Sequence, residues 1–102
     1  MMSSVSKTIG AQDTFSDSLP LVGHFNLSIS GTFVATVTVQ RSFDGGSTWF
    51  DVDTFTAATE TYGFDPQQVH YRAGVKTGDY TSGSVVVSLY EDAETSRSIR
   101  LA

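Results

Sequence analysis

The sequence predicts an all-β protein. Apolar and polar residues alternate with a period of two along most of the chain, Val, Thr, Ser and Phe are abundant, and turn residues separate the alternating runs. A period of two places every second side chain on the same face of a strand. About seven or eight short strands joined by turns indicate a single antiparallel β-sandwich, immunoglobulin/fibronectin-like or jelly-roll-like.

The expected strands follow one another along the chain. Gly31 is expected to end a strand, and residues 65–68 are expected to form a loop because Pro66 has no N–H to donate to a ladder. Residues 5–19 are expected to supply one or two edge strands, with Phe15 and Leu19 under the sheet. The remaining strand ranges are 22–30, 32–42, 48–55, 59–64, 69–77 and 84–90.

Length and charge limit the domain organisation and the partners. The 102 residues fit one domain, with a polar N-terminal arm at about residues 1–8 and a polar C-terminal tail at about residues 91–102. The net charge is −5 and the six basic residues are dispersed, so nucleic-acid binding is not expected. The chain has no cysteine, and no apolar run resembles a membrane span or a signal peptide. A protein made in a reducing cytoplasm, with no membrane partner, fits these features best.

The most specific motif lies in RSFDGGSTWF, residues 41–50. Ser42, Asp44, Gly46, Thr48 and Trp49 fit the pattern S-x-D-x-G-x-T-W. The glycine pair can take the positive φ that a short loop requires. The aspartate is placed to accept hydrogen bonds from backbone N–H groups two or three residues on, and the hydroxyls can satisfy nearby ladder ends. The tryptophan is expected to bury its ring under the turn.

This motif resembles the Asp box of the β-propellers of sialidases and related glycan-processing enzymes. In that family the box forms a hairpin away from the active site, and a propeller needs several blades of about 40–50 residues each. A sialidase also needs an arginine cluster and a tyrosine nucleophile with an acidic partner. The candidates for such a site are Arg41, Arg72, Arg97 and Arg100 with Tyr71 and Glu60. Because Arg41 and Arg72 lie among strand residues at positions that fit solvent exposure, no enzyme is expected.

A wider resemblance covers about residues 22–90. The segments VQRSFDGGSTW, YRAGV and TSGSVVVSL are similar to small all-β proteins encoded among the head and tail genes of tailed bacteriophages and prophages. The resemblance implies a non-enzymatic structural protein of the virion, a capsid decoration or head-attached accessory protein that forms a homo-oligomer. Its implied partner is the major capsid protein or another virion protein.

Two other functions remain as alternatives to a virion structural role. One is a glycan- or receptor-binding module of a phage spike or fibre, with Tyr80 in the loop 78–83 as the candidate ligand contact. The other is a cell-surface adhesion module, which the lack of a signal sequence disfavours.

No cofactor or metal is expected. Asp44, Asp51 and Asp53 lie close in sequence, and Asp51 and Asp53 are expected on one strand face, so an oxygen-ligand Ca²⁺ site is the alternative interpretation. A solvated acidic face that discourages edge pairing is the favoured interpretation. His24 and His70 are isolated surface positions without a second ligand at metal spacing.

The core and the chain ends complete the predictions. Trp49, Phe33, Val37, Tyr71 and Val87 are expected to be mostly buried. The segment Ser-Ile-Arg-Leu near the C-terminus alternates polar and apolar residues, which is typical of a strand that adds to a sheet edge. The candidate assembly contacts in this segment are Ile99 and Leu101.

Overall fold

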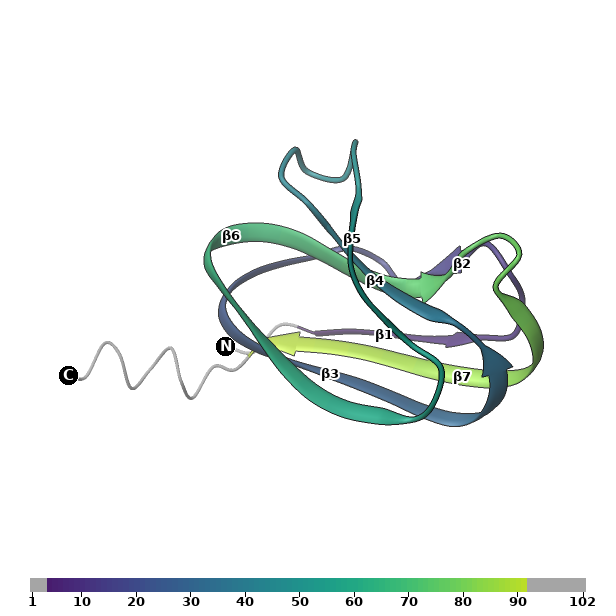
Figure 1. Cartoon of the computed structure of the whole chain (residues 1–102). Helices are drawn as coiled ribbons and strands as arrows, with labels where there is room; N and C mark the ends of the chain where they lie inside the picture. Colours follow the sequence, from purple (N-terminus) through teal and green to yellow (C-terminus); the bar gives the residue numbers. More distant parts are fainter. Residues whose placement is uncertain (1–3, 92–102) are drawn as a thin grey trace.

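The computed structural model describes residues 4–91, and these residues contain seven antiparallel strands (Figure 1). The strand order in the sheet is β1-β7-β3-β6-β4-β5, and β2 pairs with β6 outside this path. The prediction of an all-β antiparallel fold is confirmed. The strands are β1 Ser4–Ile9, β2 Thr14–Phe15, β3 Leu19–Ala35, β4 Val37–Ser42, β5 Phe50–Phe55, β6 Thr59–Val75 and β7 Tyr80–Glu91.

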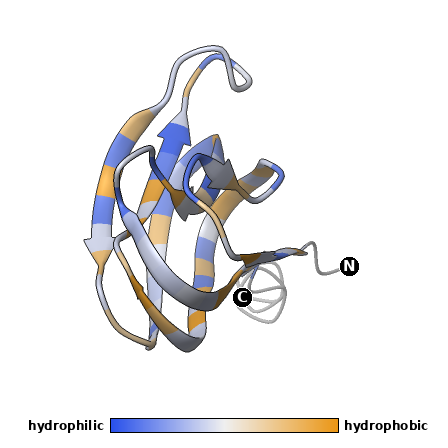
Figure 2. Cartoon of the chain, turned by 90° about the vertical axis from the view of Figure 1, so that its right-hand side faces the viewer, coloured by the Kyte–Doolittle hydropathy of each residue, from blue (hydrophilic) through white to orange (hydrophobic). Residues whose placement is uncertain are grey.

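Two long strands allow one sheet to curl around a common core. β3 and β6 each have 17 residues. β3 pairs with β6 from Leu19 to Ile29 and with β7 from Phe25 to Ala35, so the two ladders overlap along one strand. Figure 2 shows apolar and polar residues alternating along the strands, as a curled sheet with one buried face requires. The buried apolar side chains are Ile9, Leu19, Leu21, Phe25, Leu27, Ile29, Val37, Val39, Val69, Tyr71, Ala73, Val75, Val85, Val87 and Leu89.

The expected strand end at Gly31 is wrong, because β3 continues through this residue. Gly31 has a φ of 106°, and a Cβ at this position would lie 2.4 Å from the carbonyl oxygen of Ser84. The glycine therefore permits a close approach of β3 to β7. The strand is 17 residues long because glycine serves the pairing here instead of ending it.

The expected loop at residues 65–68 is also wrong, because β6 runs from Thr59 to Val75. Its register with β3 shifts between two pairs, Leu21 with Val69 and Gly23 with Asp65. Residues 66–68 lie opposite Val22 in this irregular stretch, so Pro66 occupies a bulge in the ladder. A proline is tolerated there because no ladder bond needs its missing N–H.

The N-terminal prediction of one or two edge strands is confirmed by β1 and β2. β1 pairs with β7 from Ser4 to Ile9, so residues 4–8 belong to the sheet and do not form a polar arm. Phe15 is half-buried and Leu19 is buried. The predicted C-terminal tail, with Ile99 and Leu101, lies outside the described residues apart from Glu91, which ends β7.

Five residues were predicted to be mostly buried; three of them lie in the core and the other two are partly buried outside it. Val37, Tyr71 and Val87 are buried. Phe33 is half-buried and packs against the edge of the core. Trp49 is also half-buried, because it lies in the loop before β5 and covers the outer face of the sheet.

Candidate functional site

The loop between β4 and β5 is held by two short polar side chains. Ser42 is fully buried, and its Oγ accepts hydrogen bonds from the N–H groups of Gly46 at 2.8 Å and Asp44 at 3.3 Å. The same hydroxyl donates to Asp44 Oδ1 at 2.7 Å. Asp44 Oδ1 also accepts from the N–H groups of Ser47 at 3.0 Å and Thr48 at 2.9 Å. The motif therefore closes its own loop, and the donors lie three and four residues after the aspartate.

The geometry of the loop accounts for the presence of two glycines and for the low pKa of Asp44. Gly45 and Gly46 have φ values of 77° and 106°, as the sequence predicted. A Cβ at Gly46 would lie 3.4 Å from the Trp49 ring, so the ring packs against this turn. The hydrogen bond from Ser42, followed by that from the Thr48 N–H, lowers the pKa of Asp44 from 3.8 to about 2. A charged carboxylate is thus favoured in the folded loop.

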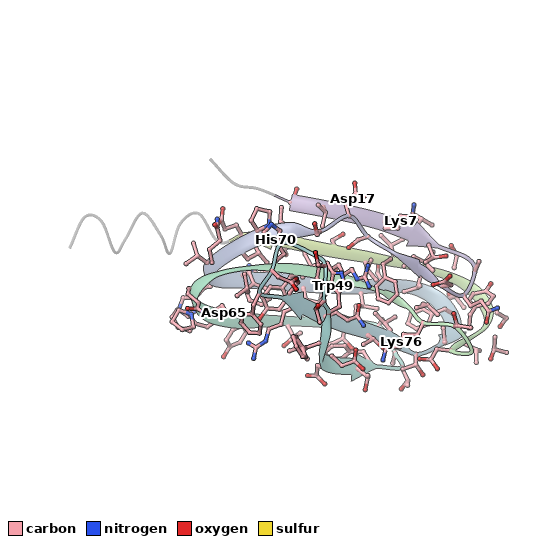
Figure 3. The ribbon with its side chains drawn as sticks, turned by 90° about the horizontal axis from the view of Figure 1, so that it is seen from above. Lys7, Asp17, Trp49, Asp65, His70 and Lys76 are labelled. Carbon is pink, nitrogen blue, oxygen red and sulfur yellow. The ribbon has the colours of Figure 1, made fainter. Side chains whose placement is uncertain are left out.

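Trp49 is held by a stack on the outer face of the sheet. The Arg72 guanidinium on β6 lies between two rings, with its Cζ 4.3 Å from the Trp49 ring centre and 4.2 Å from the Phe15 ring centre. Phe15 can lie over β6 because Gly74 has no side chain; a Cβ there would lie 2.6 Å from the Phe15 ring. Figure 3, seen from above, labels Trp49 near the middle of the ribbon. Burial lowers the pKa of Arg72, and the charge of Asp13 opposes this shift.

A chain of polar contacts continues from this stack to β5. Arg72 Nε donates to Gln40 Oε1 at 2.9 Å, and Gln40 Nε2 donates to Asp51 Oδ1 at 2.9 Å. Lys76 pairs with the other oxygen of Asp51. The hydrogen bond from Lys76, followed by that from Gln40, lowers the pKa of Asp51. These polar side chains are hydrogen-bonded or ion-paired to one another, so their contacts link β6, β4 and β5 on one face of the sheet.

A second polar cluster lies at the end of the core. The buried Tyr71 hydroxyl donates to Asp65 Oδ2 at 2.7 Å, and Arg41 Nη1 lies 3.4 Å from the same oxygen. Burial, followed by the hydrogen bond to Asp65, raises the pKa of Tyr71 to about 12. This tyrosine is therefore a neutral, buried donor.

Among the described candidates for a sialidase-like site, Arg41 and Tyr71 lie together, whereas Arg72 and Glu60 have other partners. Arg41 lies beside Tyr71, whereas Arg72 alternates to the other face of β6 and packs between aromatic rings. Glu60 accepts a hydrogen bond from Ser28 on the neighbouring β3. Arg97 and Arg100 lie outside the described residues.

The three aspartates that could form a Ca²⁺ site each have a different hydrogen-bond partner. Asp44 closes its loop, Asp51 contacts Lys76 and Gln40, and Asp53 accepts from the N–H of Thr54. The register pairs Asp51 with Gln40 and Asp53 with Val39, skipping one residue of β5. The expectation that Asp51 and Asp53 share a face is wrong, because this bulge turns them to opposite faces.

Tyr80 and the two histidines occupy ordinary positions. Tyr80 begins β7 instead of lying in a loop; its ring packs against the core and its hydroxyl donates to the carbonyl of Gly83 at 2.8 Å. The His24 ring lies 4.8 Å from the Phe64 ring. His70 is half-buried on β6.

A strip of exposed apolar side chains lies on β5 and the loop before it. We call Phe43, Phe50 and Val52 the β5 strip; their exposed fractions are 54%, 53% and 47%. With Arg41 and Asp51 they line a shallow hollow of about 420 Å³. Val52 also lines a smaller hollow of about 90 Å³ with Phe25 and Tyr62. The strip therefore runs from the β4–β5 loop to the smaller hollow beside the core residue Phe25.

Sequence reasoning missed the β5 strip, although one signal was present. Phe50 and Val52 alternate with Asp51 and Asp53, which indicates a strand with one apolar face. Only the strand order shows that β5 is the terminal strand, so that no further strand flanks it and its apolar side chains stay exposed.

Comparison with protein-family models, curated proteins and solved structures found no match. The described residues 4–91 include no helix with the length and hydropathy of a membrane span.

Proposed function

We propose that this chain is a non-enzymatic structural subunit of a tailed-phage virion, attached to the head as a decoration or accessory protein. The β5 strip is the surface through which it contacts another virion subunit. The proposal rests on the strip itself, together with the resemblance of residues 22–90 to phage head and tail proteins.

The position of the strip suits an assembly contact. β5 is a terminal strand of the sheet, so one side of its backbone has no ladder partner among residues 4–91. Phe43, Phe50 and Val52 add apolar area beside that free edge. A free edge with exposed apolar side chains is the arrangement that proteins use for strand addition, and otherwise guard against.

The polar clusters supply the rigidity that such a contact needs. The Asp-box loop fixes the approach to β5 through Ser42 and Asp44. Gln40 and Lys76 hold Asp51 on the opposite face of the strand. The strip is therefore presented by a strand that is anchored on its other face, which lowers the entropy lost on binding.

The proposal is tested by binding to particles of the parent phage that lack this protein. Wild-type chain is expected to sediment with the particles. Val52→Lys is expected to bind at least about tenfold more weakly, because it places a charge in the apolar contact. Val34→Lys is the matched control, since Val34 is an exposed valine on β3. Absence of wild-type binding, or equal binding by the two folded variants, would contradict the proposal.

A glycan-binding role is the second candidate, and one observation favours it. Tyr62 is 75% exposed at the rim of the smaller hollow, where its ring can stack on a sugar face. This function predicts that the chain binds host surface glycans and that Tyr62→Ala removes binding without lowering the melting temperature. A glycan array and thermal melts measure both outcomes.

A further inference from the structure

The β5 strip requires an occupant if it is an assembly surface. We propose that the C-terminal segment of a second copy of this chain, residues 97–101, pairs with the free edge of β5 and covers the β5 strip. The inference rests on the proposed function and names the partner of the same surface. Three properties of the segment and the strip carry it.

The apolar spacing of the segment matches the strip. Residues 97–101 read Arg-Ser-Ile-Arg-Leu, so Ile99 and Leu101 fall on one face of an extended strand. Phe50 and Val52 are likewise two residues apart on β5, with exposed side chains. An added strand therefore places two aliphatic side chains against the strip while its backbone completes the ladder of β5.

The charges of the two strands are complementary. β5 contains Asp51 and Asp53 and no basic residue, whereas residues 97–101 contain Arg97 and Arg100 and no acidic residue. Asp51 is already paired with Lys76. Asp53 has no ion-pair partner among residues 4–91, and its Oδ1 accepts only from the N–H of Thr54. The segment thus brings two cations to a strand with an unpaired carboxylate.

The chain leaves the described fold at the end of β7. Glu91, the last residue of β7, pairs with Phe25 on β3. Phe25 lines the smaller hollow together with Val52 of the strip. The residues 92–96 that follow can span at most about 17 Å when extended.

The proposed contact can be made twice in a symmetric pair of subunits. Two copies related by a two-fold axis can exchange their C-terminal segments, each covering the β5 strip of the other. Such an exchange gives the β5 edge of each subunit a ladder partner. In Figure 1, β5 lies toward the viewer and β1 lies behind it, so a partner at β5 does not obstruct the other terminal strand.

The test uses full-length chains with one damaged surface each. The segment variant carries Ile99→Asp and Leu101→Asp and keeps an intact strip. The strip variant carries Val52→Lys and keeps an intact segment. Ala93→Asp and Val34→Lys are the matched controls, because each adds a charge outside the proposed contact. Self-association is measured by sedimentation velocity, and folding is measured by thermal melts.

Wild type and both controls are expected to self-associate. Each surface variant alone is expected to associate about tenfold more weakly or less, while remaining folded. A mixture of the two surface variants is expected to form a one-to-one complex, since one intact segment can still bind one intact strip.

Three outcomes would overturn the inference. These are unchanged association of the segment variant, no complex in the mixture of folded variants, and a wild-type chain that stays monomeric. Particle binding by the wild type is measured separately, so it still supports the proposed function when the exchange fails.

Discussion

Ser42 and Asp44 organise the β4–β5 loop through short-range hydrogen bonds. Each accepts from two backbone N–H groups, and every donor lies within residues 44–48. Because all partners are local, the loop was predictable from the motif alone. The same local bonds link the stability of the loop to the ionisation of Asp44.

Asp44→Asn tests this linkage. The pKa of Asp44 falls from 3.8 to about 2 on folding, so its contribution to stability is present above pH 4 and is lost as the pH falls toward 2. The variant is expected to melt at a lower temperature than wild type at neutral pH, and the gap is expected to shrink below pH 4. Melting curves from pH 7 to pH 2 measure it; a constant gap would show that the charge does not matter.

Tyr71→Phe tests how the buried Tyr71 hydroxyl contributes to stability at alkaline pH. Removing the hydroxyl leaves the buried Asp65 without its closest donor, at a cost of roughly 1–3 kcal/mol. Because folding raises the pKa of Tyr71 to about 12, its stabilising effect is complete below pH 10 and is lost as the pH rises toward 12. Between pH 10 and 12 the free energy of unfolding is expected to fall more steeply for wild type than for the variant, because only wild type has the Tyr71 hydroxyl. Denaturant titrations at pH 8 to 12 give the comparison, and parallel curves would exclude the linkage.

At the scale of the strands, most of the fold could be predicted, and the errors share one cause. Alternation correctly placed apolar residues such as Val37 and Val87 in the core. Gly31 and Pro66 were interpreted as strand ends from their own conformational limits. Their actual roles depend on the opposite strand, where Gly31 meets Ser84 and Pro66 falls in a register shift. Such pairing is not visible in a local pattern.

The site was predictable only where its contacts are local in sequence. The hydrogen bonds of the β4–β5 loop all join residues within 42–48. The Arg72 stack joins β2, β6 and the residue before β5, so it depends on strand order. The β5 strip depends on which strand ends the sheet. Neither arrangement follows from spacing along the chain.

Arg72→Lys tests how the stack joins these elements. Lysine keeps the charge but loses the planar contact with Trp49 and Phe15 and the fixed hydrogen bond to Gln40. The expected loss of stability is about 1–2 kcal/mol. The emission of Trp49, the single tryptophan, is expected to shift to longer wavelength as its ring becomes more exposed. Unchanged emission and an unchanged melt would mean that the stack does not hold the ring.

Gly83→Ala tests the close approach of β3 and β7. Gly83 has a φ of 91°, and a Cβ there would lie 2.3 Å from the carbonyl oxygen of Thr32. Gly78→Ala is the matched control, because its φ is 89° and no atom lies within 4 Å of the added Cβ. Both variants carry the cost of positive φ, about 1 kcal/mol. Gly83→Ala is expected to unfold at clearly lower denaturant concentration than Gly78→Ala, and equal midpoints would refute the steric argument.

For the whole molecule, a truncation experiment separates the folded core from the segment proposed to mediate assembly. All buried apolar side chains of the described fold lie between Ile9 and Leu89, and β7 ends at Glu91. A chain that stops after Glu91 therefore keeps this core and the β4–β5 loop. It loses residues 92–102, which include Ile99 and Leu101.

The truncated chain is expected to unfold within about 0.5 kcal/mol of wild type when both are compared as monomers at low concentration. It is also expected to lose self-association and binding to particles that lack the protein, because the segment proposed to cover the β5 strip is gone. Thermal melts and sedimentation decide between two roles for this segment. A large drop in the melting temperature of the dilute monomer would show that the segment closes the sheet of its own chain, whereas a preserved melt with lost assembly assigns it to the neighbouring subunit. Preserved melt and preserved assembly together would remove the segment from the contact and leave the β5 strip to another partner.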